Sequence, residues 1–198
     1  MISKKFLVFF TFIIISILNI NYSYALEPDV FVQSTVNRAS EALNNKYSKK
    51  EKIDKLKVIA SEAVDINGIG FYTLGAYRKN ISDDQIKQYN ILFKKYFLKS
   101  FASRLAEYSN PEIEVVSKKK LNKNYTMVNS ILVGTEQRPE VKIDWRIYTK
   151  NPKSPLIRDL IIEGLSLART QKEEFASIIQ SNDGDINALF ETLKEFIK

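Results

Sequence analysis

Apolar residues in the first third of the chain recur three and four positions apart, which is the spacing of a helix with one buried face. This pattern predicts a first helix over 29–44 and a second that carries its apolar face over 53–63. Ser48 stands just before the second stretch and is followed three places later by Glu51, the arrangement of a capping box. We therefore expect the second helix to begin directly after Ser48.

The longest predicted helix begins after Ser82, because this serine and the acidic residues after it suit a helix N-terminus. Its apolar positions continue to about Tyr108 and form a face wider than a surface helix needs. Before it, residues 65–77 contain three glycines among large apolar side chains. We interpret that stretch as a short, irregular helical connector.

After Pro111 the pattern changes to strict alternation of apolar and polar positions, which predicts β-strands joined by short turns. The strand candidates are residues 112–117, 125–134, 140–149 and 156–162. Helical spacing then returns over 170–181, where Thr170 and Glu173 fit a capping box, and over 185–197. The order of elements predicts an α+β fold with a helical N-terminal half, a four-stranded antiparallel sheet and two C-terminal helices.

The N-terminus has the layout of a secretory signal peptide. Lys4 and Lys5 precede an apolar run over residues 6–20, and small residues occupy positions 23 and 25. The alternative, an uncleaved membrane anchor, needs about 20 apolar residues in a row, and this run is shorter. We expect cleavage after Ala25, which makes residues 1–25 the signal peptide and leaves residues 26–198 as one exported domain.

Composition excludes several kinds of chemistry, since the chain has no histidine and no cysteine. The stretch around Ser166 resembles a nucleophile elbow, but no Ser-His-Asp or Cys-His relay can form. We interpret it as a strand that turns towards a helix. Residues 183–187 resemble the start of a calcium loop but lack its later ligands, so we expect Gly184 to end one helix and Asp185 to cap the next. The sequence predicts no catalytic residue, cofactor or metal site.

Charged residues leave one enzymatic alternative. Asp144, Asp159 and Glu163 lie on or beside neighbouring predicted strands and could act as a carboxylate pair in a hydrolase, although a solvated face also explains them. Without Lys4 and Lys5, 28 of the 30 basic residues remain against 23 acidic residues. This balance is compatible with acidic partners or anionic lipid headgroups but is too mild to indicate nucleic acid. Lys118 to Lys120, with Lys123, are expected to form a basic, solvated turn, and the alternative is a docking patch for an anionic surface.

The chain is rich in large apolar rings, with 12 Phe and 10 Tyr but one Trp. Many of them fall on the long helix and on the connector before it. They either fill a packed core or surround an apolar cavity that the helices and the sheet leave open. Periodicity alone does not separate these two interpretations.

The C-terminal third resembles the MlaC family, also called the toluene-tolerance family. The likeness rests on DLIIEGLSL at 159–167, on Phe175 with a following Ile-Ile pair, and on the helix start at 184–189. Upstream, Leu-Gly-Ala-Tyr at 74–77 and the aromatic spacing of 93–105 are similar to further family patterns. The resemblance covers essentially the whole of residues 29–197.

The resemblance implies a periplasmic phospholipid carrier that acts as a monomer between an outer-membrane lipoprotein complex and an inner-membrane ABC transporter and maintains lipid asymmetry. The fold would then enclose an apolar lipid cavity. An envelope adaptor with a solid core remains the non-enzymatic alternative. The residues expected to line the cavity are Phe71, Leu74, Phe93, Phe97, Phe101, Met127, Ile131, Val141, Ile143, Trp145 and Ile147.

Overall fold

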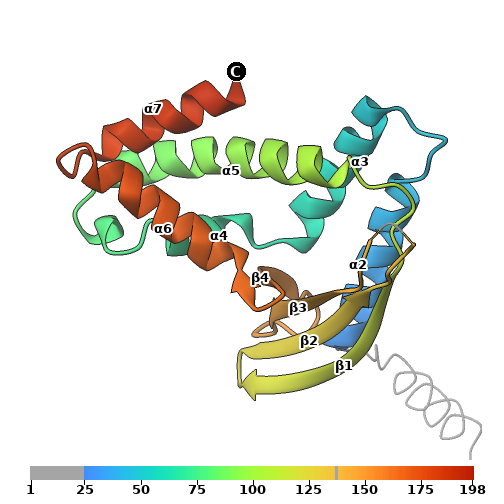
Figure 1. Cartoon of the computed structure of the whole chain (residues 1–198). Coiled ribbons are helices and arrows are strands. Elements are labelled where there is room, and N and C mark those ends of the chain that lie inside the picture. Colours follow the sequence, from blue (N-terminus) through green and yellow to red (C-terminus); the bar gives the residue numbers. More distant parts are fainter. Residues whose placement is uncertain (1–24, 137) are drawn as a thin grey trace, which may run out of the picture.

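The structure is a computed structural model that describes residues 25–136 and 138–198. The predicted signal peptide therefore lies outside the described residues, apart from Ala25 at its end. The helices are α2 (Pro28–Ala42), α3 (Lys49–Ala63), α4 (Ile66–Thr73), the 3₁₀ turn η1 (Tyr77–Lys79), α5 (Asp83–Leu105), α6 (Leu167–Gln180) and α7 (Ile186–Ile197). The strands are β1 (Ile113–Asn122), β2 (Tyr125–Leu132), β3 (Val141–Tyr148), β4 (Leu156–Ile162) and β5 (Leu165–Ser166). The α+β prediction is confirmed (Figure 1).

The strands form one antiparallel sheet in the order β1-β2-β3-β4-β5. The sheet has five strands rather than the four predicted, because two residues after β4 turn back and pair with Ile161 and Ile162. The first strand is also longer than predicted. Lys118 to Lys120 lie within β1, not in a turn, since their backbone pairs with β2. Lysines are common on such edge strands, where they hinder pairing with other chains.

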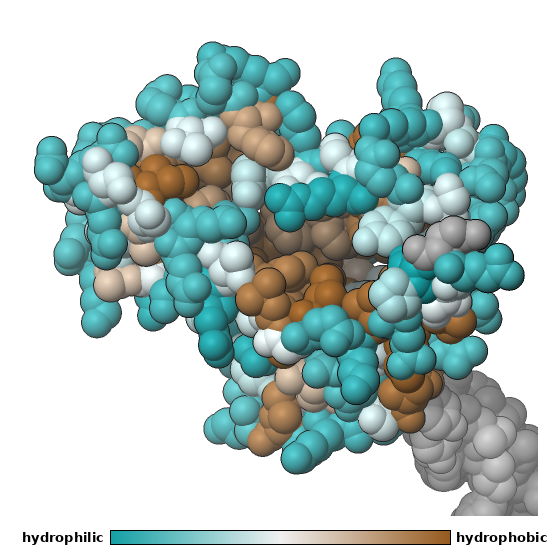
Figure 2. Space-filling model, in the orientation of Figure 1, coloured by the Kyte–Doolittle hydropathy of each residue, from teal (hydrophilic) through white to brown (hydrophobic). Residues whose placement is uncertain are grey.

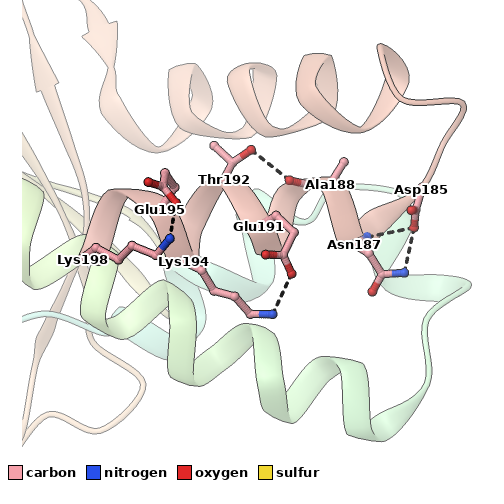
Figure 3. A network of polar contacts seen from close by, with 8 residues as sticks. All are labelled: Asp185, Asn187, Ala188, Glu191, Thr192, Lys194, Glu195 and Lys198. Carbon is pink, nitrogen blue, oxygen red and sulfur yellow. Dashed lines mark hydrogen bonds and ion pairs between the residues drawn. The ribbon is translucent and has the colours of Figure 1, made fainter.

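Local capping rules place most helix starts. The capping box predicted at Ser48 is present, and Ser82, predicted as a helix cap, also forms a capping box with Gln85. Asp185 caps α7 after Gly184, whose φ of 82° is the left-handed conformation that glycine adopts readily. Figure 3 shows Asp185 hydrogen-bonded to Asn187 at the start of α7, and the ion pairs Glu191–Lys194 and Glu195–Lys198 further along the helix.

The predicted start of α6 is wrong by one turn. The helix begins at Leu167, and the Ser166 hydroxyl accepts a hydrogen bond from the Arg169 backbone N–H at 3.1 Å. Thr170, the predicted cap, lies inside the helix and donates its hydroxyl to the Ser166 carbonyl. The alternative interpretation of Ser166, a turn from strand to helix, is confirmed.

The sheet has two distinct faces, which the strand register defines. Val128, Trp145 and Leu160 are neighbours across three strands and lie on the face that α2 covers, here called the inner face. Met127 and Arg146 are neighbours on the opposite, outer face. Side chains alternate between the two faces along each strand.

The molecule has separate apolar cores instead of a single one. One core joins α4, α5, α6 and α7, a second joins α2 to the inner face, and a third joins α3 to the end of α5. Half-buried Val64 contacts both the first and the second core. The long helix α5 packs mainly on α3, α4 and α7 rather than on the strands, whereas α4 and α6 contact β4 (Figure 1).

Candidate functional site

Figure 2 shows the surface hollowed between the helical layer and the sheet, with hydrophobic residues gathered inside the recess and hydrophilic residues around it. This recess, here called the hollow, lies where the two layers do not share a core. In water such a surface is unfavourable unless something apolar covers it. The hollow is therefore the first candidate for a binding site.

The α5 wall of the hollow carries a row of aromatic rings. Phe93 is buried against α4, and its ring lies so close to Gly70 that a Cβ atom added there would be 2.7 Å from it. Ala102 is buried against α3. An α-helix turns about 100° per residue, so Phe97 and Phe101 lie between these two rows. Both are half-buried, and their rings stack with centroids 5.6 Å apart. They form a half-buried strip of α5 between its contacts with α4 and α3, and Phe97 also packs against the first core.

The sheet wall is the inner face of β3. Ile143 and Trp145 are buried on it and Val141 is half-buried. The Trp145 indole N–H donates to the Ser130 hydroxyl at 2.8 Å, and that hydroxyl donates to the Ile143 carbonyl at 3.0 Å. Because its polar atom is bound within the sheet, the indole presents an apolar surface.

The structure divides the predicted lining residues between the two faces. Ile143 and Trp145 lie on the inner face, whereas Met127 pairs with Arg146 and Ile131 pairs with Lys142 on the outer face. Met127 and Ile131 are therefore not brought together with the β3 residues. The predicted set therefore combines residues from both faces of the sheet. The inward positions of β2 are Thr126, Val128, Ser130 and Leu132.

Other predicted lining residues occupy the helical core or the surface. Leu74 and Phe93 are buried with α6 and α7, and Ile147 is fully buried beside α2. Phe71 is 49% exposed, and the Arg78 guanidinium lies 4.9 Å from its ring centroid. Val128 and Leu132, which the prediction omitted, lie on the inner face, and only the alternation of β2 could have indicated them.

The carboxylates of the hydrolase alternative all bind structural donors. Asp159 is buried and accepts hydrogen bonds from the Ser166 hydroxyl at 2.7 Å and the Ala168 backbone N–H at 3.1 Å. Asp144 accepts from the Asn129 amide, and Glu163 accepts from the Lys142 backbone. The three groups thus fix turns and strands. Within residues 25–136 and 138–198, no group of three His, Cys, Asp or Glu side chains is suited to hold a metal ion.

Two ionisable groups with shifted pKa values join neighbouring secondary-structure elements. Burial raises the pKa of the Tyr89 phenol, which is hydrogen-bonded to Thr73 and joins α5 to α4. A hydrogen bond from Lys118 lowers the pKa of Asp29, which joins β1 to α2. The contacts of both groups are structural and do not indicate a catalytic site.

No helix in the described part of the chain combines the length and hydropathy needed to cross a bilayer. Comparison with curated protein sequences gives no match. Among solved structures, the chain is similar to the phospholipid-binding protein from Ralstonia solanacearum, solved in complex with a phospholipid. The two chains share 20% identity with a TM-score of 0.72, over 87% of this chain and 97% of that one. This likeness shows a shared fold.

The model of one protein family, described as MlaC protein, matches residues 33–195. The match spans the helical layer, the whole sheet and most of α7. The chain therefore belongs to the MlaC protein family.

Proposed function

We propose that this chain is a phospholipid carrier of the periplasm, with residues 1–25 removed as a signal peptide. It holds the acyl chains of one lipid in the hollow and acts as a monomer. It exchanges lipid with an outer-membrane lipoprotein complex and an inner-membrane ABC transporter, which maintains outer-membrane asymmetry. Family membership and the phospholipid bound to a protein of the same fold support this proposal.

The observation that carries the proposal is the apolar hollow between two layers with separate cores. At about 0.8 kcal/mol per buried methylene, a diacyl lipid with roughly 30 methylenes faces a cost of about 25 kcal/mol in water. A carrier has to shelter the chains and needs no reactive group. Half-buried Phe97 and Phe101 offer such shelter on one wall, and Trp145 on the other.

Native mass spectrometry of protein purified without detergent tests the proposal. We expect one phospholipid per chain in the wild type. Phe97→Asp places a charge on the hollow's wall, and we expect it to lose most of the bound lipid because a buried carboxylate opposes acyl chains. Ile91→Asp is the matched control, since Ile91 lies on the same helix but is 60% exposed.

A wild-type protein that carries no lipid under gentle conditions would contradict the carrier proposal and favour an adaptor. Full occupancy in Phe97→Asp would instead show that α5 does not line the site. Lipid loss in both variants would indicate general instability, which circular dichroism would reveal.

A further inference from the structure

A second recess, of about 420 Å³, lies on the outer face of the sheet, between α4, the ends of β1 and β2, and the start of α6. Its polar lining includes Arg146, Arg158, Asp159, Tyr125 and Asn122, and Ile69 and Leu121 contribute apolar walls. Because Arg146 lies on the face opposite Trp145, this outer pocket is distinct from the hollow. Ligand pockets typically measure about 300–1,000 Å³, so it suits a small ligand.

A β-bulge shapes the outer pocket. Arg146 pairs with Asp159 and Ile147 pairs with Ile157, so Arg158 is the extra residue of β4. The Arg158 side chain donates to Asp65 at 2.6 Å and to the Tyr125 hydroxyl at 2.8 Å. These two hydrogen bonds hold Arg158 between the start of α4 and β2.

The Arg146 guanidinium differs from that of Arg158 in its hydrogen bonding. The Arg146 side chain is 41% exposed, and its charged contact in the described part of the chain is Nη1 to Asp159 Oδ2 at 3.6 Å. That distance is too long for a hydrogen bond. A guanidinium has five N–H donors in a fixed fork, so Arg146 retains donors for a ligand in the pocket.

The carboxylates beside the pocket are already neutralised in part. Asp65 accepts from the Gly68 backbone N–H at the start of α4, and Asp159 accepts from the Ala168 N–H at the start of α6. Such helix N-termini carry partial positive charge. Lys119 is aligned with Arg146 through Met127 on the same face. The local balance therefore favours an anion.

We propose that the outer pocket binds a phosphate group, with the Arg146 guanidinium as its main ligand. The planar fork of arginine matches two phosphate oxygens, and the Tyr125 and Asn122 side chains border the same space. The phosphate belongs either to a free phosphomonoester or to a lipid headgroup at a membrane surface. This site does not depend on the carrier function proposed for the hollow.

Isothermal titration calorimetry with glycerol 3-phosphate and inorganic phosphate tests the site. Arg146→Gln should weaken binding by about ten- to a hundred-fold, as expected for loss of charge-assisted hydrogen bonds. Arg146→Lys should fall between the two, because it keeps the charge without the fork. Lys142→Gln is the matched control, since it removes the same charge from the same strand and face, and it should bind like the wild type.

Co-sedimentation with phosphatidylglycerol vesicles, compared with phosphatidylcholine vesicles, identifies the source. Binding of the free esters alone assigns a soluble ligand, and vesicle binding that Arg146→Gln abolishes assigns a headgroup. Equal weakening in Arg146→Gln and Lys142→Gln, or no binding in either arm, would overturn the proposal. Native mass spectrometry should find unchanged lipid in Arg146→Gln. Loss of that lipid would refute the independence of the two sites, whereas a wild type without lipid would affect only the carrier proposal.

Discussion

The hydrogen bonds of Tyr89 allow a specific prediction about the packing of α5 on α4. The Thr73 hydroxyl donates to the Gly70 carbonyl at 2.8 Å and lies 2.8 Å from the Tyr89 hydroxyl. A hydroxyl has a single proton to donate, so Tyr89 must be the donor to Thr73. Both residues are buried, with 0% and 1% exposure.

Because the hydrogen bonds run from Tyr89 to Thr73 to Gly70, removing the Thr73 hydroxyl and removing the Tyr89 hydroxyl should cost different amounts of stability. Thr73→Val leaves the buried Tyr89 donor without an acceptor and should cost about 1–3 kcal/mol. Tyr89→Phe leaves Thr73 bonded to Gly70 and should cost only about 0.5–1.5 kcal/mol. In the double variant both groups are apolar, so adding Tyr89→Phe to Thr73→Val should restore roughly 1 kcal/mol of stability.

Urea denaturation followed by circular dichroism measures these differences, provided that the m-values stay constant. Tyr108→Phe serves as a control, because Tyr108 is 40% exposed and its change should stay within about 0.5 kcal/mol. If Tyr89→Phe proves as costly as Thr73→Val, and the double variant shows no recovery, the assigned direction of the hydrogen bonds is wrong.

Three further changes test other parts of the structure. Burial raises the pKa of Tyr89, so this residue ionises at lower pH in the unfolded chain than in the folded one, and stability should fall as the pH rises above about 10. The urea midpoint should therefore decline less steeply with pH in Tyr89→Phe than in the wild type. Equal declines in the two proteins would argue against this. Ser166→Ala removes the cap of α6 and a donor to Asp159, and should lower the free energy of unfolding by about 0.5–2 kcal/mol; an unchanged melting temperature would deny the cap its role. Gly70→Ala places a methyl group against the Phe93 ring and should cost about 1–3 kcal/mol in the same denaturation assay, whereas a neutral effect would mean that the ring moves aside freely.

Features that depend on neighbouring residues were predictable from the sequence. The caps at Ser48, Ser82 and Asp185 involve partners within three positions, so a short window contains all the groups that form them. The alternation of β3 likewise identified its apolar face, because Ile143 and Trp145 share that face whatever the partner strands are.

Features that depend on pairing between distant segments were not predictable. β1 extends through Lys120 because β2 supplies hydrogen-bond partners, which the composition of β1 does not reveal. Met127 and Ile131 are apolar, yet the register with β3 turns them to the outer face. The start of α6 depends on the contact of Ser166 with Asp159 on β4, and Thr170 offered an equally good local cap.

The hollow itself depends on how the layers are joined. Val64 pairs with Ile157, and the Asp65 backbone N–H donates to the Ile157 carbonyl at 2.9 Å, while the Asp65 side chain binds Arg158. These contacts fasten the corner between α3 and α4 to β4. Along α5, by contrast, the aromatic row passes from the buried Phe93 to half-buried rings beyond it. The same spacing of aromatic residues therefore places one end of the row in a core and the other end on a half-buried surface. Which end is buried depends on where β4 pairs with the corner between α3 and α4, and the spacing of the aromatic residues contains no information about that pairing.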